Sequence, residues 1–241
     1  RAAPVLALAL LVGGSAAAES PSKTVEKTLP LAAAGRLSVD TYKGRVTVAA
    51  WDREEASIRA VVTPDGSCDT AAELVEKTRV RIEGGGKEVR VVSDYDDLPK
   101  RVFSFSSDCS NRPFVAYEIR MPRSASLDVK DYKSRIAVEG VTGAVGVESY
   151  KGTMRLSGLA SALEVETYKG DVVAEFDRLG GSVRAETYKG EIELAFPKGA
   201  RIDLRERVGR RGVLRADLAD TDGGTPVSVE TRKGTIRLRS R

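Results

Sequence analysis

Short stretches of alternating hydrophobic and polar residues recur along most of the chain. Around one Tyr-Lys-Gly tripeptide, for example, Val145 and Val147 precede the tripeptide, and Met154 and Leu156 follow it. Alternation with a period of two is typical of β-strands that bury one face. The pattern therefore predicts a chain built mostly of strands, with a core of Val, Ile and Leu.

The Tyr-Lys-Gly tripeptide, or a close variant, marks the centre of a repeat. Four successive copies have central lysines 18, 18 and 20 residues apart, which is typical of a repeated structural unit. Glycine in the third position suits a turn, and Ser134 in that position predicts a turn that is strained or differently shaped. LRERVGRRGVL (204–214) fits as a degenerate copy with Val208 in the lysine position. The clear copies are VDTYKGRVTV (39–48), VKDYKSRIAV (129–138), VESYKGTMRL (147–156), VETYKGDVVA (165–174), AETYKGEIEL (185–194) and VETRKGTIRL (229–238).

Two all-β architectures fit these units. In an antiparallel β-meander or sandwich, each tripeptide is a hairpin turn. In a parallel β-helix-like solenoid of 18–20-residue coils, equivalent residues stack on strands about 4.8 Å apart. The repetition of the same Tyr and Lys favours the solenoid, because a hairpin turn does not need them. We expect the solenoid and keep the meander or sandwich as the alternative.

Residues 64–122 interrupt the repeat and read as a small α+β insertion. The spacing of apolar residues predicts a short helix over 70–78, and Gly84-Gly85-Gly86 predicts a hairpin over 80–92. Residues 114–122 read as a strand that ends at Pro122.

The N-terminus has the order of regions found in secretory signal peptides. Arg1 precedes an apolar run too short to span a bilayer, and Ala16 and Ala18 fit a cleavage site after Ala18. We therefore expect a periplasmic or secreted protein. In such a compartment, Cys68 and Cys109 predict a disulfide. The expected parts are a signal peptide (1–18), a linker with the first strand (19–34) and one repeat domain (35–241) containing the insertion.

The composition excludes several kinds of chemistry. The 241 residues include no His and two Cys, which excludes His-dependent nucleophilic catalysis, His-ligated zinc or haem, and four-cysteine clusters. The 39 basic and 35 acidic residues are interleaved, so no nucleic-acid partner is indicated. We expect a non-enzymatic protein without cofactor or metal. A polysaccharide-active enzyme that uses carboxylates or arginine is the alternative.

The repeat resembles the bacterial putative-adhesin family of β-strand-repeat proteins, a family of unknown function. The resemblance covers about residues 24–240, and it rests on GRLSVDTYKGRVTVAAWDREEASIRA (35–60) and YEIRMPRSASLDVKDYKSRIAVEGVTGAVGVESYKG (117–152). It implies a β-helix-like repeat in an envelope or secreted protein, with no catalytic residues to carry over. This chain departs from the family by placing Tyr-Lys before the turn glycine in nearly every unit.

The recurring tyrosines and lysines form the candidate site. Stacked rings at a coil corner have a structural role, and a Tyr/Lys strip can also bind a glycan or an anionic envelope polymer, with rings on sugar faces and lysines on phosphate or carboxylate groups. A surface protein or an assembly partner is the further alternative. The strip comprises Tyr42, Lys43, Tyr132, Lys133, Tyr150, Lys151, Tyr168, Lys169, Tyr188, Lys189 and Lys233.

Acidic residues recur three positions before the lysines. This column could offset repulsion among the lysines, and Lys130 is its exception. Neither this column nor Asp94, Asp96 and Asp97 has the pattern of a calcium repeat, so we read both as solvated. The column consists of Asp40, Glu148, Glu166, Glu186 and Glu230.

Overall fold

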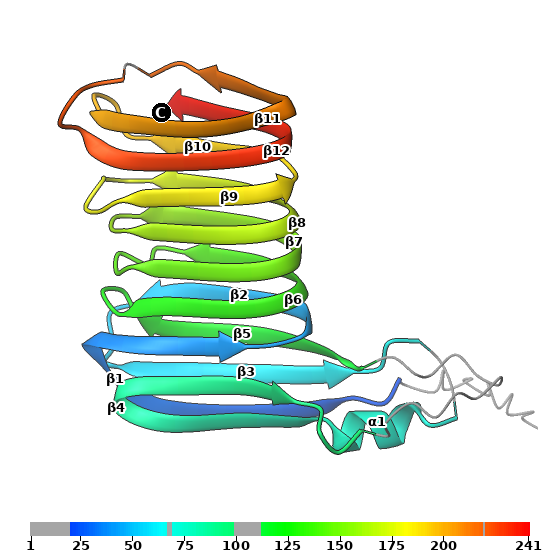
Figure 1. The fold of residues 1–241 in the computed structure, drawn as a ribbon. Coiled ribbons are helices and arrows are strands. Elements are labelled where there is room, and N and C mark those ends of the chain that lie inside the picture. The colour runs from blue at the N-terminus through cyan, green and yellow to red at the C-terminus, as the bar shows by residue number, and fades with distance from the viewer. Residues whose placement is uncertain (1–19, 67–68, 99–111, 219) are drawn as a thin grey trace, which may run out of the picture.

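A computed structural model describes residues 20–66, 69–98, 112–218 and 220–241. In these residues the protein is nearly all β: one mixed sheet of twelve strands accompanies a single helix (Figure 1). The expected signal peptide (1–18) and the expected disulfide between Cys68 and Cys109 lie outside the described residues.

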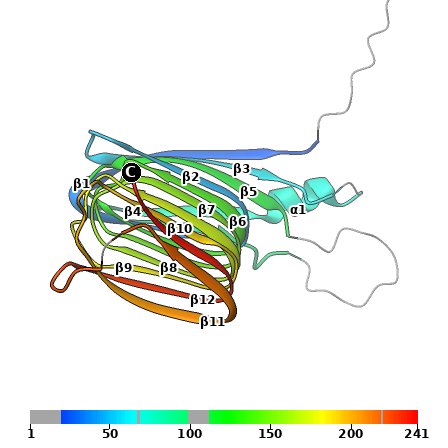
Figure 2. The ribbon, with the colours of Figure 1, turned by 90° about the horizontal axis from the view of Figure 1, so that it is seen from above.

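The strands are stacked in layers from one end of the molecule to the other (Figures 1 and 2). The repeat strands pair in parallel, and Lys133, Lys151, Lys169 and Lys189 are successive partners in register. The antiparallel meander is therefore wrong for the repeat. The strands are β1 (Lys23–Asp40), β2 (Lys43–Trp51), β3 (Glu55–Thr63), β4 (Arg79–Asp94), β5 (Phe114–Pro122), β6 (Ser126–Glu139), β7 (Val145–Leu159), β8 (Leu163–Phe176), β9 (Val183–Lys189), β10 (Ile192–Phe196), β11 (Ile202–Ala216) and β12 (Thr225–Ser240).

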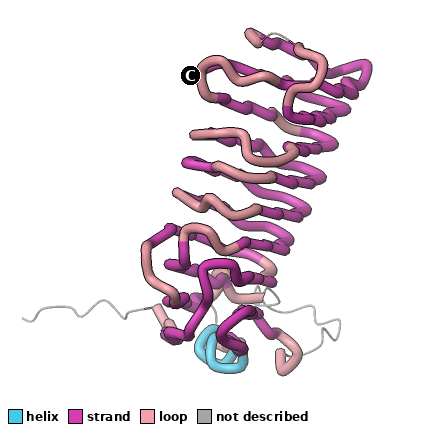
Figure 3. The backbone as a smooth tube through the Cα atoms, turned by 90° about the vertical axis from the view of Figure 1, so that its left-hand side faces the viewer, coloured by secondary structure: helices cyan, strands magenta, loops and turns pink. Residues whose placement is uncertain are grey.

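The alternating pattern explains the core. Val145, Val147, Met154 and Leu156 are all buried, and equivalent residues of the other layers join them in one apolar cluster. Figure 3 shows the same layering, with strands in magenta and the loops between them in pink. Each layer buries one face of its strands against the others, which the repeat predicts.

The third position of the motif is glycine because neighbouring layers approach closely there. A Cβ atom on Gly152 would lie 2.0 Å from the carbonyl oxygen of Ser134, and one on Gly190 would lie 2.0 Å from that of Gly170. Ser134 fits because Asp131 accepts hydrogen bonds from its backbone nitrogen at 2.7 Å and its hydroxyl at 2.5 Å. Ser134 lies within the continuous strand β6, in register with Gly152 of β7, so this position is part of a strand rather than the predicted turn.

The interrupting segment is only partly as expected. Helix α1 (Ala71–Lys77) and strand β5 confirm the predicted helix and strand, and Leu74 and Val75 of α1 are buried. The predicted hairpin over 80–92 is wrong, because these residues belong to the single strand β4, whose second half pairs in parallel with β1. Gly84, Gly85 and Gly86 lie within β4 and all have a positive φ.

The degenerate copy is shifted from its expected alignment. Val208 pairs with Thr231, whereas Arg211 pairs with Lys233, so Arg211 rather than Val208 occupies the lysine position. Gly209 and Arg210 of β11 therefore lie opposite a single residue of β12, which is a β-bulge. The expected alignment is wrong because it contains no such inserted residue.

Candidate functional site

The recurring tyrosines form one continuous stack, which we call the tyrosine ladder: Tyr42, Tyr132, Tyr150, Tyr168 and Tyr188. Neighbouring ring centroids are 4.7–5.0 Å apart, and the planes differ by 4–14°. The three inner rings remain 37–40% exposed. The spacing matches the distance between strands because each ring leaves the same position of its layer. The stacking predicted from the repeat is confirmed.

The faces of the inner rings are not accessible. Tyr132, Tyr150 and Tyr168 each have a parallel ring on both sides. The expectation that these rings pack on sugar faces is therefore wrong. Their edges and hydroxyl groups form the exposed part of the ladder, and these groups offer hydrogen bonds and ring edges rather than ring faces.

Five lysines follow the ladder in register, and we call them the lysine row: Lys133, Lys151, Lys169, Lys189 and Lys233. In the described part of the chain, no ion pair joins a carboxylate to any of them. The Nζ atoms of Lys151 and Lys169 lie 5.3 and 5.1 Å from the ring centroids of Tyr150 and Tyr168. The row is thus held beside the rings with its positive charge uncompensated by acids.

Lys43 has the same repeat position but a different environment. Its side chain is 8% exposed, forms an ion pair with Asp65 and lies 4.6 Å from the centroid of Phe114. Lys43 therefore does not belong to the accessible strip, contrary to expectation. Both partners belong to the interrupting segment (64–122), about whose contacts the repeat motif contains no information.

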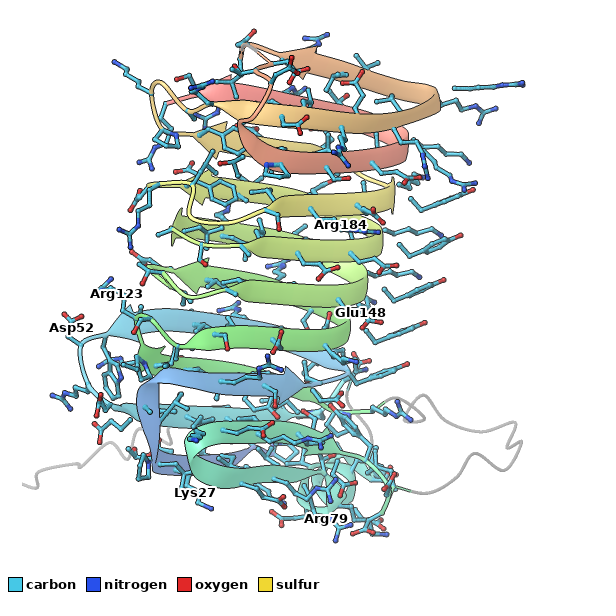
Figure 4. The ribbon with its side chains drawn as sticks, turned by 60° about the vertical axis from the view of Figure 1, so that its left-hand side comes forward. Lys27, Asp52, Arg79, Arg123, Glu148 and Arg184 are labelled. Atoms are coloured by element: carbon cyan, nitrogen blue, oxygen red, sulfur yellow. The ribbon has the colours of Figure 1, made fainter. Side chains whose placement is uncertain are left out.

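A groove of about 480 Å³ runs along the other flank of the ladder, and we call it the acidic groove. All the tyrosines of the ladder except Tyr42 and all the residues of the acidic column except Asp40 line it, but the lysine row does not. Figure 4 labels Glu148 near the edge of the stack from which side chains project. The acidic groove is lined by Asp131, Tyr132, Glu148, Ser149, Tyr150, Glu166, Thr167, Tyr168, Glu186, Thr187, Tyr188, Glu230 and Arg232.

The acidic column has partners other than the lysine row. Glu148 pairs with Lys130 at 3.7 Å, and Glu186 pairs with Arg184 at 2.8 Å. The expected offset of the lysine row by this column is therefore wrong. Most of the negative charge is instead compensated on its own flank, which separates it from the lysines.

Sequence reasoning missed a buried polar column directly beneath the ladder. The residues directly before the tyrosine position of the motif are buried: Thr41, Ser149, Thr167, Thr187 and Thr231. The hydroxyl of Ser149 donates to Asp131 of the next layer at 2.9 Å. The sequence did contain a signal for this column, because a Ser or Thr recurs at a position that the alternating pattern assigns to the core.

Asp131 is a half-buried acid that occupies the equivalent position in β6. Burial raises the pKa of its carboxyl above the ordinary value, while hydrogen bonds from Ser134 and Ser149 act in the opposite direction. The carboxyl oxygens accept bonds from both serines, so Asp131 links two layers. This role is structural because its hydrogen bonds run within and between strands.

The predicted solvated cluster at Asp94 is partly buried. The side chain of Asp94 is 5% exposed and pairs with Arg79 and Arg81 at 3.5 Å each. Asp97 pairs with Arg79 at 3.1 Å. Across the described ranges, no group of three or more acidic, Cys or His residues has the arrangement of a metal site, and no helix has the length and apolar character to cross a membrane.

The fold is similar to that of proteins described in connection with adhesion. No family model and no curated protein sequence match the chain. A crystal structure of a putative cell adhesion protein from Clostridium sporogenes ATCC 15579 shares 12% identity over 91% of this chain and 100% of that chain, with a TM-score of 0.50. A putative adhesin from Bacteroides fragilis NCTC 9343 shares 12% identity over 91% of this chain and 97% of that chain, with a TM-score of 0.48. The first likeness concerns the fold, and it agrees with the resemblance seen in the sequence.

Proposed function

We propose that this protein is an exported, non-enzymatic, adhesin-like interaction module that binds an extended anionic envelope polymer along the lysine row. The observation that carries the proposal is the in-register row of lysines without carboxylate partners in the described structure. The parallel pairing and continuous core also support a β-helix-like solenoid as its scaffold.

The spacing of the row suits a polymer better than a small anion. Successive lysines are one strand apart, which is about 4.8 Å. A chain with regularly spaced phosphate, sulfate or carboxylate groups can contact several lysines at once, so weak single contacts combine into useful affinity. A single small anion would contact only one or two positions of the row.

The ladder supports this role by holding the lysines in place. Stacked tyrosines contribute about 0.5–1.5 kcal/mol per pair beyond area burial, which stiffens the corner from which the lysines extend. The exposed ring edges and hydroxyls add hydrogen-bonding groups beside the charges. A preorganised row loses less side-chain entropy on binding than a flexible one.

The experiment is a titration with heparin and polygalacturonate, which carry different anionic groups. The triple variant Lys151→Gln, Lys169→Gln, Lys189→Gln should bind each polymer at least about tenfold more weakly than the wild type. The matched control removes Arg120, Arg135 and Arg155, which are exposed basic residues outside the row. Equal binding by the row variant and the wild type would exclude the proposed site.

A polysaccharide-active enzyme is the second candidate, and the acidic groove favours it. Glu148, Glu166 and Glu186 line this groove on neighbouring strands. Paired carboxylates are the usual groups of glycoside hydrolysis. If the protein is such an enzyme, the wild type should release reducing ends from an envelope polysaccharide, and Glu166→Gln should abolish this release. The binding-module proposal expects intact polymer after incubation with the wild type.

A further inference from the structure

A second hollow lies at the C-terminal end of the ladder, where the stack ends in β12 and β11. Its volume is about 390 Å³, and we call it the C-terminal hollow. It adjoins Tyr188, the last ring of the ladder, and includes Lys233, the last residue of the lysine row. The hollow is lined by Tyr188, Arg207, Gly209, Arg210, Arg211, Glu230, Arg232 and Lys233.

The bulge in β11 explains why arginines gather there. Arg211 pairs in register with Lys233, while Gly209 and the additional residue Arg210 lie opposite Arg232. A Cβ atom on Gly209 would lie 2.8 Å from the carbonyl oxygen of Arg232, so the two strands are close at this point. The bulge thus places two basic side chains where earlier layers have one.

These cations are largely uncompensated. Glu230 is the acidic residue of the hollow, and it pairs with Arg207 at 3.4 Å. For Arg210, Arg211, Arg232 and Lys233, the described residues provide no carboxylate partner. Residues 201–241 contain eleven Lys or Arg and six Asp or Glu, whereas residues 1–200 contain 28 and 29. The excess positive charge of the chain is therefore concentrated at this end.

The chemistry of the hollow matches a phosphoryl group. Guanidinium groups donate paired hydrogen bonds to phosphate oxygens, and three arginines with one lysine supply many donors around one volume. A phosphate monoester has a charge of about −1.5 to −2 and three acceptor oxygens, which engage more of these donors than one carboxylate does.

We infer that the C-terminal hollow is a phosphate-binding subsite that holds a phosphoryl group of a phosphate-bearing polymer lying along the lysine row. The polymer part of this inference rests on the proposed function. The phosphate-binding part rests on the hollow alone, because only Lys233 is shared with the row. A small phosphate probe can therefore test the hollow separately.

The probe is inorganic tripolyphosphate, titrated into the purified full chain by calorimetry. The variant Arg210→Gln, Arg211→Gln should weaken binding by about tenfold or more, since each loses charge-assisted hydrogen bonds. The matched control Arg205→Gln, Arg215→Gln removes two exposed arginines of the same strand outside the hollow, and it should bind as the wild type does. Circular dichroism and thermal unfolding confirm that each variant is folded.

The outcomes separate the hollow from the row. Loss in the hollow variant, with binding retained by the β11 control Arg205→Gln, Arg215→Gln, supports the hollow. Absence of binding by the wild type, equal binding by the hollow variant or equal loss in the β11 control overturns it. If tripolyphosphate binds in the hollow but long-chain polyphosphate binds no more tightly, the hollow stands and the lysine row fails as a polymer site. If an equal concentration of citrate displaces tripolyphosphate, the hollow does not prefer phosphate groups over carboxylates, which would overturn the inference that it is a phosphate-binding subsite.

Discussion

The two ends of the tyrosine ladder have the same motif and opposite accessibility. At the N-terminal end, Arg112 lies 4.3 Å from the ring centroid of Tyr42, and the lysine of that layer is buried against Asp65. At the C-terminal end, Arg232 replaces the next tyrosine, and Lys233 lines an open hollow. The motif determines where a side chain lies in its layer. The segments packed beside that layer determine whether a charged side chain has an acidic partner.

The largest expected effect tests what the two ends share. A Cβ atom on Gly44 would lie 2.1 Å from the carbonyl oxygen of Val115, and one on Gly234 would lie 1.8 Å from that of Gly190. Because backbone cannot move away cheaply, Gly44→Ala and Gly234→Ala should each lower the free energy of unfolding by about 3 kcal/mol or more. Urea unfolding measures this loss.

The control for these variants is Gly199→Ala. Gly199 has a φ of +74° but open space around its Cβ position. Its substitution therefore measures the cost of backbone strain without a clash between neighbouring layers. It should cost only about 1–2 kcal/mol. Equal losses at all three glycines would show that backbone strain, rather than contact between layers, explains why glycine occupies this position at both ends.

A smaller effect tests how the two ends differ. Lys43→Gln leaves the partly buried Asp65 without its cation, so it should lower the free energy of unfolding by about 1–3 kcal/mol. Lys233→Gln removes a charge that has no acidic partner in the described structure and should change stability by less than about 0.5 kcal/mol. Denaturant titration of both variants checks the comparison, and equal losses would contradict it.

The smallest expected effect concerns pH. Burial raises the pKa of Asp131 above 3.8, so the native state retains its proton where the unfolded chain has lost it. The free energy of unfolding therefore falls as the pH rises through this range. The equivalent residues of the following layers, Ser149, Thr167, Thr187 and Thr231, do not titrate, so within this column the dependence arises at Asp131.

Urea unfolding at a series of pH values tests this assignment. Asp131→Asn should remove part of the fall in stability, whereas Glu139→Gln, which changes an exposed acid of the same strand, should retain it. If the two variants show the same dependence on pH, Asp131 is not its source.

The sequence was sufficient for the features that repeat and insufficient for those that do not. Periodicity predicted the stacked tyrosines and the helix α1, because both follow from local spacing. The burial of Lys43 depends on Asp65 and Phe114, which lie outside its repeat unit. The C-terminal hollow depends on one inserted residue in β11, which an ungapped comparison of repeats cannot detect.

The most direct test of the account compares one repeat position in two environments. Heparin affinity is measured by calorimetry for Lys43→Gln and Lys169→Gln, under conditions where both variants are folded. The account predicts that Lys169→Gln binds several-fold more weakly than the wild type and that Lys43→Gln binds equally well, because only Lys169 is exposed and without an acidic partner in the described structure. Equal weakening by both, or by neither, would contradict it.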